Sequence, residues 1–295
     1  MSKNEGDVMY AVAGVTGNTG SVVADELIRR GKQVRVVVRD AAKGDEWKAK
    51  GAEVAVASLD DADALAGALT GVEGAYLLSP PDLKATDMIA IGRQRGETFA
   101  EAIRKSGVRH VVFLSSVGAQ HENGTGPIRS LHQIEKRLIP LGVAVTLLRP
   151  AYFLENWGAS LGPAASDGML PSVLPAGFGF PQIATRDIGV AAADALENPP
   201  PAVRIIELAG AEEHTPTEIA SVIGAILGKE VKVDEAPLDA IVPALTSFGI
   251  SEHVAGLYRE MNEGLLNGTV DWDGKGERKR GSTTPEEVFR PMLQR

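Results

Sequence analysis

Three glycines near the start of the chain constrain its fold more than any other feature. They lie in the segment GVTGNTG at residues 14–20, between an apolar run at residues 10–13 and a helical pattern at residues 21–30. In such a strand–turn–helix unit the first glycine permits the tight turn, the second lets the backbone approach a pyrophosphate, and the third lets helix and strand pack closely. The segment therefore predicts a dinucleotide-binding site. The simpler alternative is a glycine-rich turn without a ligand.

The residue that closes the next strand indicates which dinucleotide would bind. A second strand pattern at residues 33–38 completes a βαβ unit and is followed by Arg39 and Asp40. Sites for NAD usually place Asp or Glu here, about 20 residues after the glycines, to bind the ribose 2′-OH. A guanidinium instead offers a fork of donors to a 2′-phosphate. We therefore expect NADP(H), with NAD(H) disfavoured, and the alternative is a solvated arginine at a strand end.

Length and composition narrow the class of protein. The 295 residues, 44% of them hydrophobic, suffice for one large α/β domain and a smaller lobe. No apolar run reaches the roughly 20 residues that span a bilayer, and the first residues, MSKNEGD, lack the apolar core of a signal peptide. The absence of cysteine excludes thiolate chemistry and fits a cytoplasmic protein. A net charge of −9 disfavours nonspecific binding to nucleic acid.

Strand and helix patterns alternate along most of the chain. Strands are predicted at residues 10–13, 33–38, 53–57, 74–78, 110–116, 143–149 and 203–208, and helices at residues 21–30, 42–50, 61–69, 88–106, 128–138 and 185–196. Such alternation is typical of a parallel sheet with helices on both faces. The predicted fold class is α/β: a doubly wound, Rossmann-like parallel sheet with a smaller, mostly helical C-terminal lobe.

The remaining segments predict that lobe. Residues 157–182 are rich in Gly, Pro, Ala and Ser, and we expect loops around a substrate pocket there. Helices are predicted at residues 215–228, 239–248 and 251–264 and from residue 284, the first and last opened by capping boxes. Residues 271–281 are polar and are expected to form a mobile link, and the lobe has too little strand for a second sheet. We therefore divide the chain into a dinucleotide-binding domain, residues 7–156 with 183–210, and a substrate or partner lobe, residues 157–182 with 211–295.

Six motifs occur in an order that is specific to one family. They are GVTGNTG at residues 14–20, VVVR at 36–39, VVFLSS at 111–116, TLLRPAYFLEN at 146–156, TRDI at 185–188 and IELAG at 206–210. This set resembles the NmrA-like group of atypical short-chain dehydrogenases/reductases, and in particular its members that reduce quinones or triphenylmethane dyes. The resemblance implies that Arg39 meets the 2′-phosphate and that the adenine lies beside Ser58 and Leu59. Many members carry Asp where this chain has Ser58.

The acid/base pair of typical short-chain dehydrogenases is missing from its expected place. Those enzymes use Tyr-x-x-x-Lys, in which the tyrosine passes a proton to or from a substrate oxygen. In relatives the lysine lies a fixed distance before an acidic residue and an Arg-Pro pair. Counting back without a gap from Glu135 and from Arg149-Pro150 reaches Leu131 at the lysine position and Pro127 at the tyrosine position.

A second pair on the same helix, His132-x-x-x-Lys136, lies one residue out of this register. A shift of one residue turns a helical side chain by about 100°. We therefore expect His132 to be a partly exposed helix residue, with a place facing the nicotinamide as the alternative. Lys136 is expected to be a solvated charge near the helix C-terminus, where the helix dipole favours it.

Further candidates lie at the carboxyl ends of strands, where ligands bind in this fold. Ser115 and Ser116 either hydrogen-bond the nicotinamide or substrate or satisfy the backbone, and Tyr152, Phe153 and Asn156 either wall the nicotinamide or pack in the core. The catalytic candidates are His132, Tyr152 and Ser116. The cofactor-binding candidates are Gly14, Thr16, Gly17, Asn18, Thr19, Gly20, Arg39, Ser58, Leu59, Leu78, Ser79, Ser115, Tyr152 and Phe153. The other histidines lack metal-ligand spacing, so we expect no metal site.

Two functions fit these observations. The first is an NADPH-dependent oxidoreductase that passes hydride to a quinone or a similar conjugated, electron-poor acceptor. Such an acceptor needs close apposition to the cofactor, whereas a simple ketone also needs the missing acid. The second is a catalytically silent, NADP(H)-responsive regulator that binds a protein partner through the helical lobe. The expected partner is thus a small-molecule electron acceptor, or a protein for a regulator, and the fold class is compatible with a homodimer.

Overall fold

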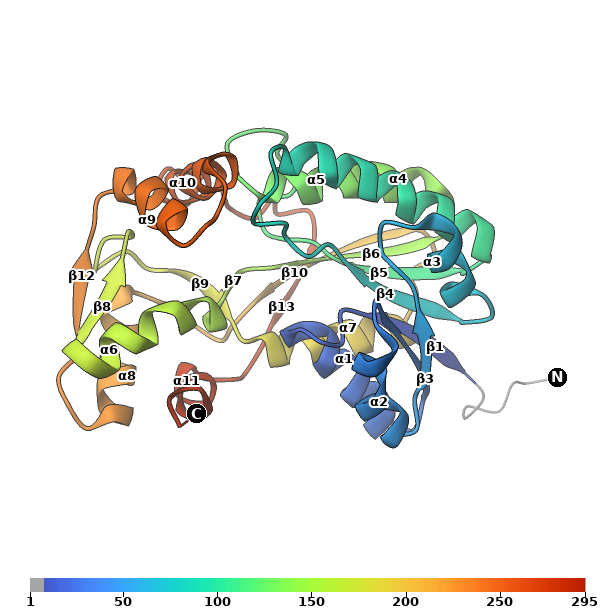
Figure 1. Cartoon of the computed structure of the whole chain (residues 1–295), viewed down its shortest axis with the longest axis horizontal. Helices are drawn as coiled ribbons and strands as arrows, with labels where there is room; N and C mark the ends of the chain where they lie inside the picture. The colour runs from blue at the N-terminus through green and yellow to red at the C-terminus, as the bar shows by residue number, and fades with distance from the viewer. Residues whose placement is uncertain (1–7, 295) are drawn as a thin grey trace.

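Eight parallel strands form the central sheet of the structure, a computed structural model that describes residues 8–294 (Figure 1). The strands are β1 (Met9–Ala13), β2 (Gln33–Val38), β3 (Glu53–Val56), β4 (Gly74–Leu78), β5 (His110–Leu114), β6 (Ala144–Pro150), β10 (Val203–Ala209) and β13 (Glu277–Arg280). Their order is β13-β10-β6-β5-β4-β1-β2-β3. Strand β1 lies between β4 and β2, with Val12 opposite Tyr76 on one side and Val36 on the other. All three side chains are fully buried.

Helices cover both faces of this sheet, which confirms the predicted doubly wound fold. On one face lie α1 (Asn18–Arg29), α2 (Asp45–Ala49) and α7 (Thr185–Glu197), and on the other lie α3 (Ala62–Leu69), α4 (Met88–Ser106) and α5 (Ile128–Leu138) (Figure 1). Successive side chains of a strand point to opposite faces of a sheet. Tyr76 therefore packs in the core beneath α1 and α7, and its neighbour Leu77 packs in the core with Phe99 of α4.

A smaller lobe with much helix stands beyond one end of the sheet (Figure 1). Its helical segments are η4 (Leu154–Ser160), α6 (Leu161–Asp167), α8 (Pro216–Leu227), η5 (Leu238–Ala240), α9 (Ile241–Ser247), α10 (Glu252–Leu266) and α11 (Pro285–Leu293). Both predicted capping boxes form: Thr215 with Glu218 opens α8, and Thr284 with Glu287 opens α11. Within residues 8–294, no helix combines the length and the apolar character needed to cross a membrane.

Two predictions for the lobe are wrong. Residues 157–182 are not mainly loop, because they contain most of η4, all of α6 and β8 (Met169–Ser172), and the first part of β9 (Phe180–Ile183). The lobe also has strand pairing: β8 pairs with β12 (Lys232–Glu235), and β9 pairs with β7 (Tyr152–Phe153) and β11 (Glu213–His214). These strands are two to four residues long, too short for the alternating pattern that marks a strand in a sequence.

The segment at residues 271–281 is also not a link, because its last part is the edge strand β13. This strand pairs in parallel with β10, with Glu277 opposite Ile206. The turn before it is held by the buried Glu207 carboxylate, which accepts hydrogen bonds from the backbone N–H groups of Asp273 and Gly274, both at 3.1 Å. The sequence ERKR hid the strand, since edge strands tolerate a row of charges.

The helix predicted at residues 42–50 is divided in two. A 3₁₀ turn, η2 (Ala41–Gly44), precedes the short helix α2. The Asp40 carboxylate accepts a hydrogen bond from the backbone N–H of Ala42 at 3.0 Å, so it caps the 3₁₀ turn. Gly44 lies against the side chain of Val54, where a Cβ would clash, and this close approach keeps η2 packed on β3.

Candidate functional site

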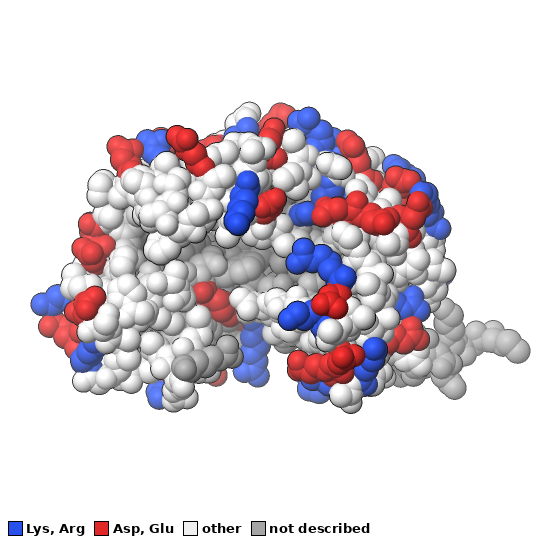
Figure 2. Space-filling model, in the orientation of Figure 1, with Lys and Arg blue, Asp and Glu red and all other residues white. Residues whose placement is uncertain are grey.

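A cavity of about 670 Å³ lies between the carboxyl ends of the sheet strands and the smaller lobe. Figure 2 shows the hollow that it makes in the surface. The cavity walls come from the β1–α1 turn, the ends of β2, β4 and β5, the helix α5, the segment after β6, the strand β9 and the helix α10. The chain reverses its strand order between β1 and β4, and such a switch point is where open α/β sheets bind their ligands.

The β1–α1 turn presents free backbone N–H groups to this cavity. Gly14 has φ +72°, which favours glycine, and its carbonyl accepts a hydrogen bond from Gly17 N at 2.9 Å. A Cβ on Gly20 would meet the carbonyl oxygens of Ala13 and Gly14. The helix α1 has no side-chain cap and no acidic residue in its first turn, so its N-terminus is suited to an anion. Gly14, Thr16, Gly17, Asn18 and Thr19 line the cavity, and buried Gly20 packs behind them.

Arg39 lies at the edge of the same cavity, directly after β2. Its side chain is exposed, and it forms no salt bridge with another residue of the described range 8–294. The neighbouring carboxylate of Asp40 is occupied with the backbone of η2. The guanidinium is therefore available to an anionic group on a ligand.

The loops after β3 and β4 are joined by a buried arginine that the sequence analysis did not single out. Arg95 of α4 donates from Nε to Asp60 Oδ1 and from Nη1 to Ser79 Oγ, both at 2.8 Å. Ser79 and Leu78 line the cavity, and their contact with a cofactor stays a prediction. Ser58 and Leu59, by contrast, are outside the set of residues that line it. The hydroxyl of Ser58 accepts from Asp60 N at 3.2 Å, and its adenine contact stays a prediction.

Helix α5 presents no acid or base at the positions where a Tyr-Lys pair would stand. Pro127 and Leu131 both line the cavity. His132 is outside the set of lining residues, and its Nδ1 lies 2.8 Å from the carbonyl oxygen of Ala119. Because a carbonyl only accepts, Nδ1 is the donor there and carries a proton. Lys136 is exposed at the far end of the helix.

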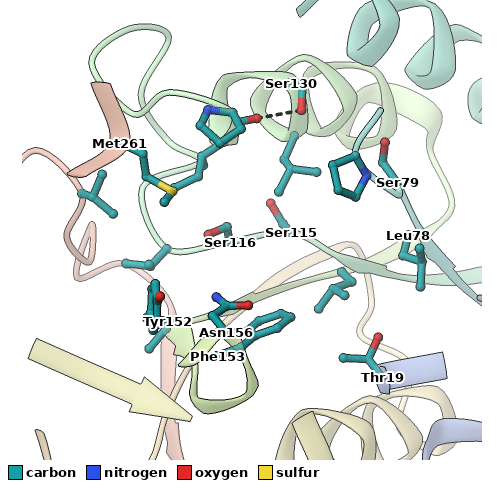
Figure 3. A pocket seen from close by; sticks show the side chains of 18 of the residues that line it. Thr19, Leu78, Ser79, Ser115, Ser116, Ser130, Tyr152, Phe153, Asn156 and Met261 are labelled. Carbon is teal, nitrogen blue, oxygen red and sulfur yellow. Dashed lines mark hydrogen bonds between the residues drawn. The ribbon is translucent and has the colours of Figure 1, made fainter. Parts of the chain in front are cut away.

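The two serines after β5 have different partners. The Ser115 hydroxyl donates to Glu135 Oε1 at 2.6 Å. Glu135 in turn pairs with Arg149, so Ser115 belongs to a buried network although it also borders the cavity. Ser116 also lines the cavity, and its hydroxyl forms no hydrogen bond within the part of the chain that the structure describes (Figure 3).

Aromatic side chains wall the end of the cavity that faces the lobe. The Tyr152 ring packs edge-to-face against two other rings. Its centroid lies 5.3 Å from that of Phe180 and 6.3 Å from that of Trp157. Burial, with a smaller contribution from Tyr258, raises the pKa of Tyr152 to about 12, so its phenol keeps its proton at neutral pH. Phe153 and Tyr152 both line the cavity (Figure 3). This end is apolar and suited to a flat conjugated ring.

Several wall residues were not named individually as site candidates in the sequence analysis, although the segment at residues 157–182 was expected around a substrate pocket. They are Phe178, Phe180, Tyr258, Met261 and Leu265, together with Met88 at the start of α4. Residues 258, 261 and 265 have a helical spacing that places them on one face of α10. That spacing predicts a buried helix face, but it does not say what the face covers.

The fold and the cavity define a Rossmann-type protein with a ligand cavity at the carboxyl edge of its sheet. The chain belongs to the NmrA-like family, whose model matches residues 8–282. This confirms the family resemblance drawn from the motifs.

Individual relatives are similar over most of their length. The NAD(P)H azoreductase of Xenophilus azovorans is 26% identical, over 86% of each chain. Quinone oxidoreductase 2 of Escherichia coli (strain K12) is 28% identical, over 90% of this chain and 91% of that protein. The solved structure of the Escherichia coli quinone oxidoreductase with NADPH has a TM-score of 0.81 at 26% identity and covers 97% of this chain and 100% of that one. The Citrobacter triphenylmethane reductase with NADP(H), at 21% identity and a TM-score of 0.80 over 96% of this chain and 100% of that one, shares the fold.

Proposed function

We propose that this protein is an NADPH-dependent oxidoreductase that reduces a quinone or a similar conjugated, electron-poor acceptor. The observation that carries the proposal is the composition of one cavity: an anion-binding glycine turn with Arg39 at one end, aromatic walls at the other, and Pro127 and Leu131 where a Tyr-Lys pair would stand. The relatives named as quinone and azo reductases, and the NADPH in a solved relative, support the same activity.

The residues at the glycine end fit NADPH. The free amides at the start of α1 would bind the pyrophosphate, where a Cβ on Gly20 would disrupt the close packing of turn and helix. Arg39 would bind the 2′-phosphate that distinguishes NADPH from NADH. When bound, the reduced nicotinamide supplies two electrons and a proton as hydride.

The protein's own contribution at the other end is to position the acceptor against an apolar wall. Leu131 and the ring of Phe153 make the wall apolar, and Tyr152 holds its proton too firmly to act as a general acid at neutral pH. An acceptor reduced here must therefore tolerate a transient negative charge without a strong acid beside it. Quinones do so, because the charge spreads over an aromatic ring and the oxygen takes its proton from water.

The alternative, a catalytically silent NADP(H)-responsive regulator, is not favoured. A protein that only senses a dinucleotide has no use for a cavity that continues past the nucleotide end to Tyr152, Phe180 and Tyr258. The two relatives described above, an azoreductase and a quinone oxidoreductase, are also named as reductases.

Steady-state oxidation of NADPH tests the proposal. The purified protein is mixed with NADPH and with quinones, azo dyes or triphenylmethane dyes, and absorbance at 340 nm is followed. We expect saturable turnover with quinones, loss of it in Gly20→Val, and no loss in Gly67→Ala, whose added Cβ meets no neighbouring atom. Thermal unfolding checks that both variants fold. Tight NADPH binding without turnover above background for all three acceptor classes would contradict the enzyme and favour the regulator.

Location and assembly stay predictions. The cysteine-free composition fits a cytoplasmic protein, because disulfides are rare in that compartment. A homodimer is compatible with the fold class, and gel filtration with light scattering would detect it.

A further inference from the structure

Two buried hydroxyl groups meet beside the glycine turn, at the nucleotide end of the cavity. Tyr76 of β4 is fully buried, and Thr19, in the first turn of α1, is 6% exposed. The Tyr76 phenol oxygen lies 3.0 Å from Thr19 Oγ1. Thr19 also lines the cavity, and Figure 3 shows its oxygen directed into it. The pair therefore connects the core of the sheet to the site.

The direction of this hydrogen bond follows from burial. A hydroxyl group has one proton to donate and lone pairs that accept. Within residues 8–294, Thr19 is the one hydrogen-bond partner of the Tyr76 phenol. If Thr19 donated, the phenol proton would be left in the apolar core without an acceptor, and a buried unsatisfied donor is costly. Tyr76 is therefore the donor. Burial keeps its proton in place, because it raises the pKa of the phenol above its usual value.

The proton of the Thr19 hydroxyl is consequently free for a ligand. Serine and threonine in a helix often donate to a carbonyl oxygen three or four residues earlier. Ser21 in the same helix does so, to Gly17 O at 2.7 Å and to Asn18 O at 3.1 Å. The Thr19 hydroxyl makes no such bond within the part of the chain that the structure describes. Because its oxygen accepts from the core side, its proton is directed away from the core.

We propose that the Thr19 hydroxyl donates a hydrogen bond to the diphosphate of NADPH and that Tyr76 is the positioning residue that orients it. The diphosphate is the anion that the free amides of the same helical turn would bind. A hydrogen bond to a charged acceptor is stronger than one between neutral groups. A hydroxyl oriented before binding also loses little rotamer freedom. The inference rests on the proposed function, because it gives the bound NADPH a side-chain donor in addition to the backbone.

Variants that remove one oxygen at a time test the assignment. Thr19→Val and Tyr76→Phe keep the shapes of the two side chains, and quenching of protein fluorescence measures the Kd of NADPH. We expect this Kd to rise roughly tenfold in Thr19→Val, which loses a hydrogen bond to a charged group. In Tyr76→Phe we expect a rise of roughly threefold, because the hydroxyl stays but is no longer oriented.

The conservative variant and two matched controls complete this set. Thr19→Ser keeps the hydroxyl, and its Kd for NADPH should stay within about threefold of the wild-type value. Thr98→Val in α4 and Tyr10→Phe in β1 make the same chemical changes at residues outside the set that lines the cavity. Both should leave the Kd of NADPH unchanged. A Thr19→Ser protein that binds as weakly as Thr19→Val would contradict a role for the hydroxyl.

The double variant Thr19→Val/Tyr76→Phe separates orientation from folding. Thr19→Val alone leaves the phenol buried without an acceptor, whereas replacing both partners by apolar groups of the same shape is nearly neutral for stability. Thermal unfolding measures that difference. If Tyr76 acts through Thr19, the double variant has the same Kd for NADPH as Thr19→Val. A further loss of binding on adding Tyr76→Phe to Thr19→Val would overturn the positioning role of Tyr76.

A fragment of the cofactor identifies the group that Thr19 contacts. Adenosine 2′-phosphate carries the 2′-phosphate but lacks the diphosphate, so calorimetry should give it the same Kd in Thr19→Val and wild type. Equal losses for this fragment and for NADPH, or an unchanged Kd for NADPH, would overturn the proposal. If the wild type binds NADPH but reduces no acceptor, the proposed function fails, and these constants still decide the role of Thr19. If the wild type does not bind NADPH, both fail.

Discussion

The Arg149 guanidinium of β6 lies 2.6 Å from the Glu135 carboxylate of α5, and both side chains are buried. Arg149 also reaches Asp273 at 2.9 Å, in the turn before the edge strand β13. Through Ser115, which borders the cavity and donates to Glu135, the network joins the cavity wall to Asp273, 124 residues after Arg149 in the chain. The Arg149–Glu135 contact connects α5 to β6, and Arg149–Asp273 connects β6 to the last strand of the sheet.

Removing one partner of this network should destabilise the fold. The variant Arg149→Met leaves the Glu135 carboxylate buried and unpaired, and we expect the free energy of unfolding to fall by about 3–5 kcal/mol. Urea denaturation followed by circular dichroism measures it. Lys232→Met, which removes an exposed partner of Glu230, serves as the control and should change stability little. A loss below about 1 kcal/mol in Arg149→Met would show that the network contributes little.

Replacing Arg39 should change the choice of dinucleotide. In Arg39→Asp a carboxylate faces the 2′-phosphate, and we expect the Kd of NADPH to rise at least about tenfold more than the Kd of NADH. Quenching of protein fluorescence during titration measures both constants. Lys232→Asp makes the same change of net charge away from the cavity and should leave the ratio of the two constants unchanged. Equal losses for NADPH and NADH in Arg39→Asp would refute the assignment.

His132 should be dispensable for catalysis. Its Nδ1 proton is committed to the carbonyl oxygen of Ala119, and Leu131 rather than His132 lines the cavity. We expect His132→Ala to change kcat with a quinone by no more than about twofold. A large loss of kcat with an unchanged Kd for NADPH would show instead that the imidazole takes part in proton transfer.

The free energy of unfolding should fall as the pH is lowered from 6.5 to 4, because of His110. Burial, together with the charge of Arg204, lowers the pKa of this histidine from 6.5 to about 4. In that interval the unfolded chain takes up a proton that the folded protein does not, so the free energy of unfolding falls as the pH falls, by up to about 3 kcal/mol. Urea denaturation at several pH values measures the slope. The slope should be shallower in His110→Gln, and equal slopes for the two proteins would contradict the lowered pKa.

Local sequence patterns predicted the parts of the site that a single βαβ unit builds. The glycine turn follows from backbone geometry within seven residues, and Arg39 follows from its place after the second strand. The order of apolar strands likewise predicted the doubly wound sheet, since parallel strands buried on both faces are apolar throughout.

The aromatic end of the cavity, which faces the lobe, could not be predicted in the same way. Tyr258 and Met261 reach the cavity only because α10 packs beside the start of α5, although it begins more than 110 residues after α5 ends. Nothing in the local pattern around α10 distinguishes a helix face that covers a cavity from one that covers a core. The strand β13 was missed for another reason, since its four charged residues lack apolar alternation. The network partner Asp273 was missed with it.

Single-turnover kinetics test the central claim, that one cavity holds NADPH and the acceptor together, most directly. Protein loaded with one equivalent of NADPH is mixed with a naphthoquinone in an anaerobic stopped-flow instrument, and absorbance at 340 nm is followed. The account predicts a single exponential decay whose rate constant saturates as the quinone concentration rises. A decay whose rate constant rises linearly with the quinone concentration, and equals the rate constant of free NADPH with the same quinone, would contradict the account.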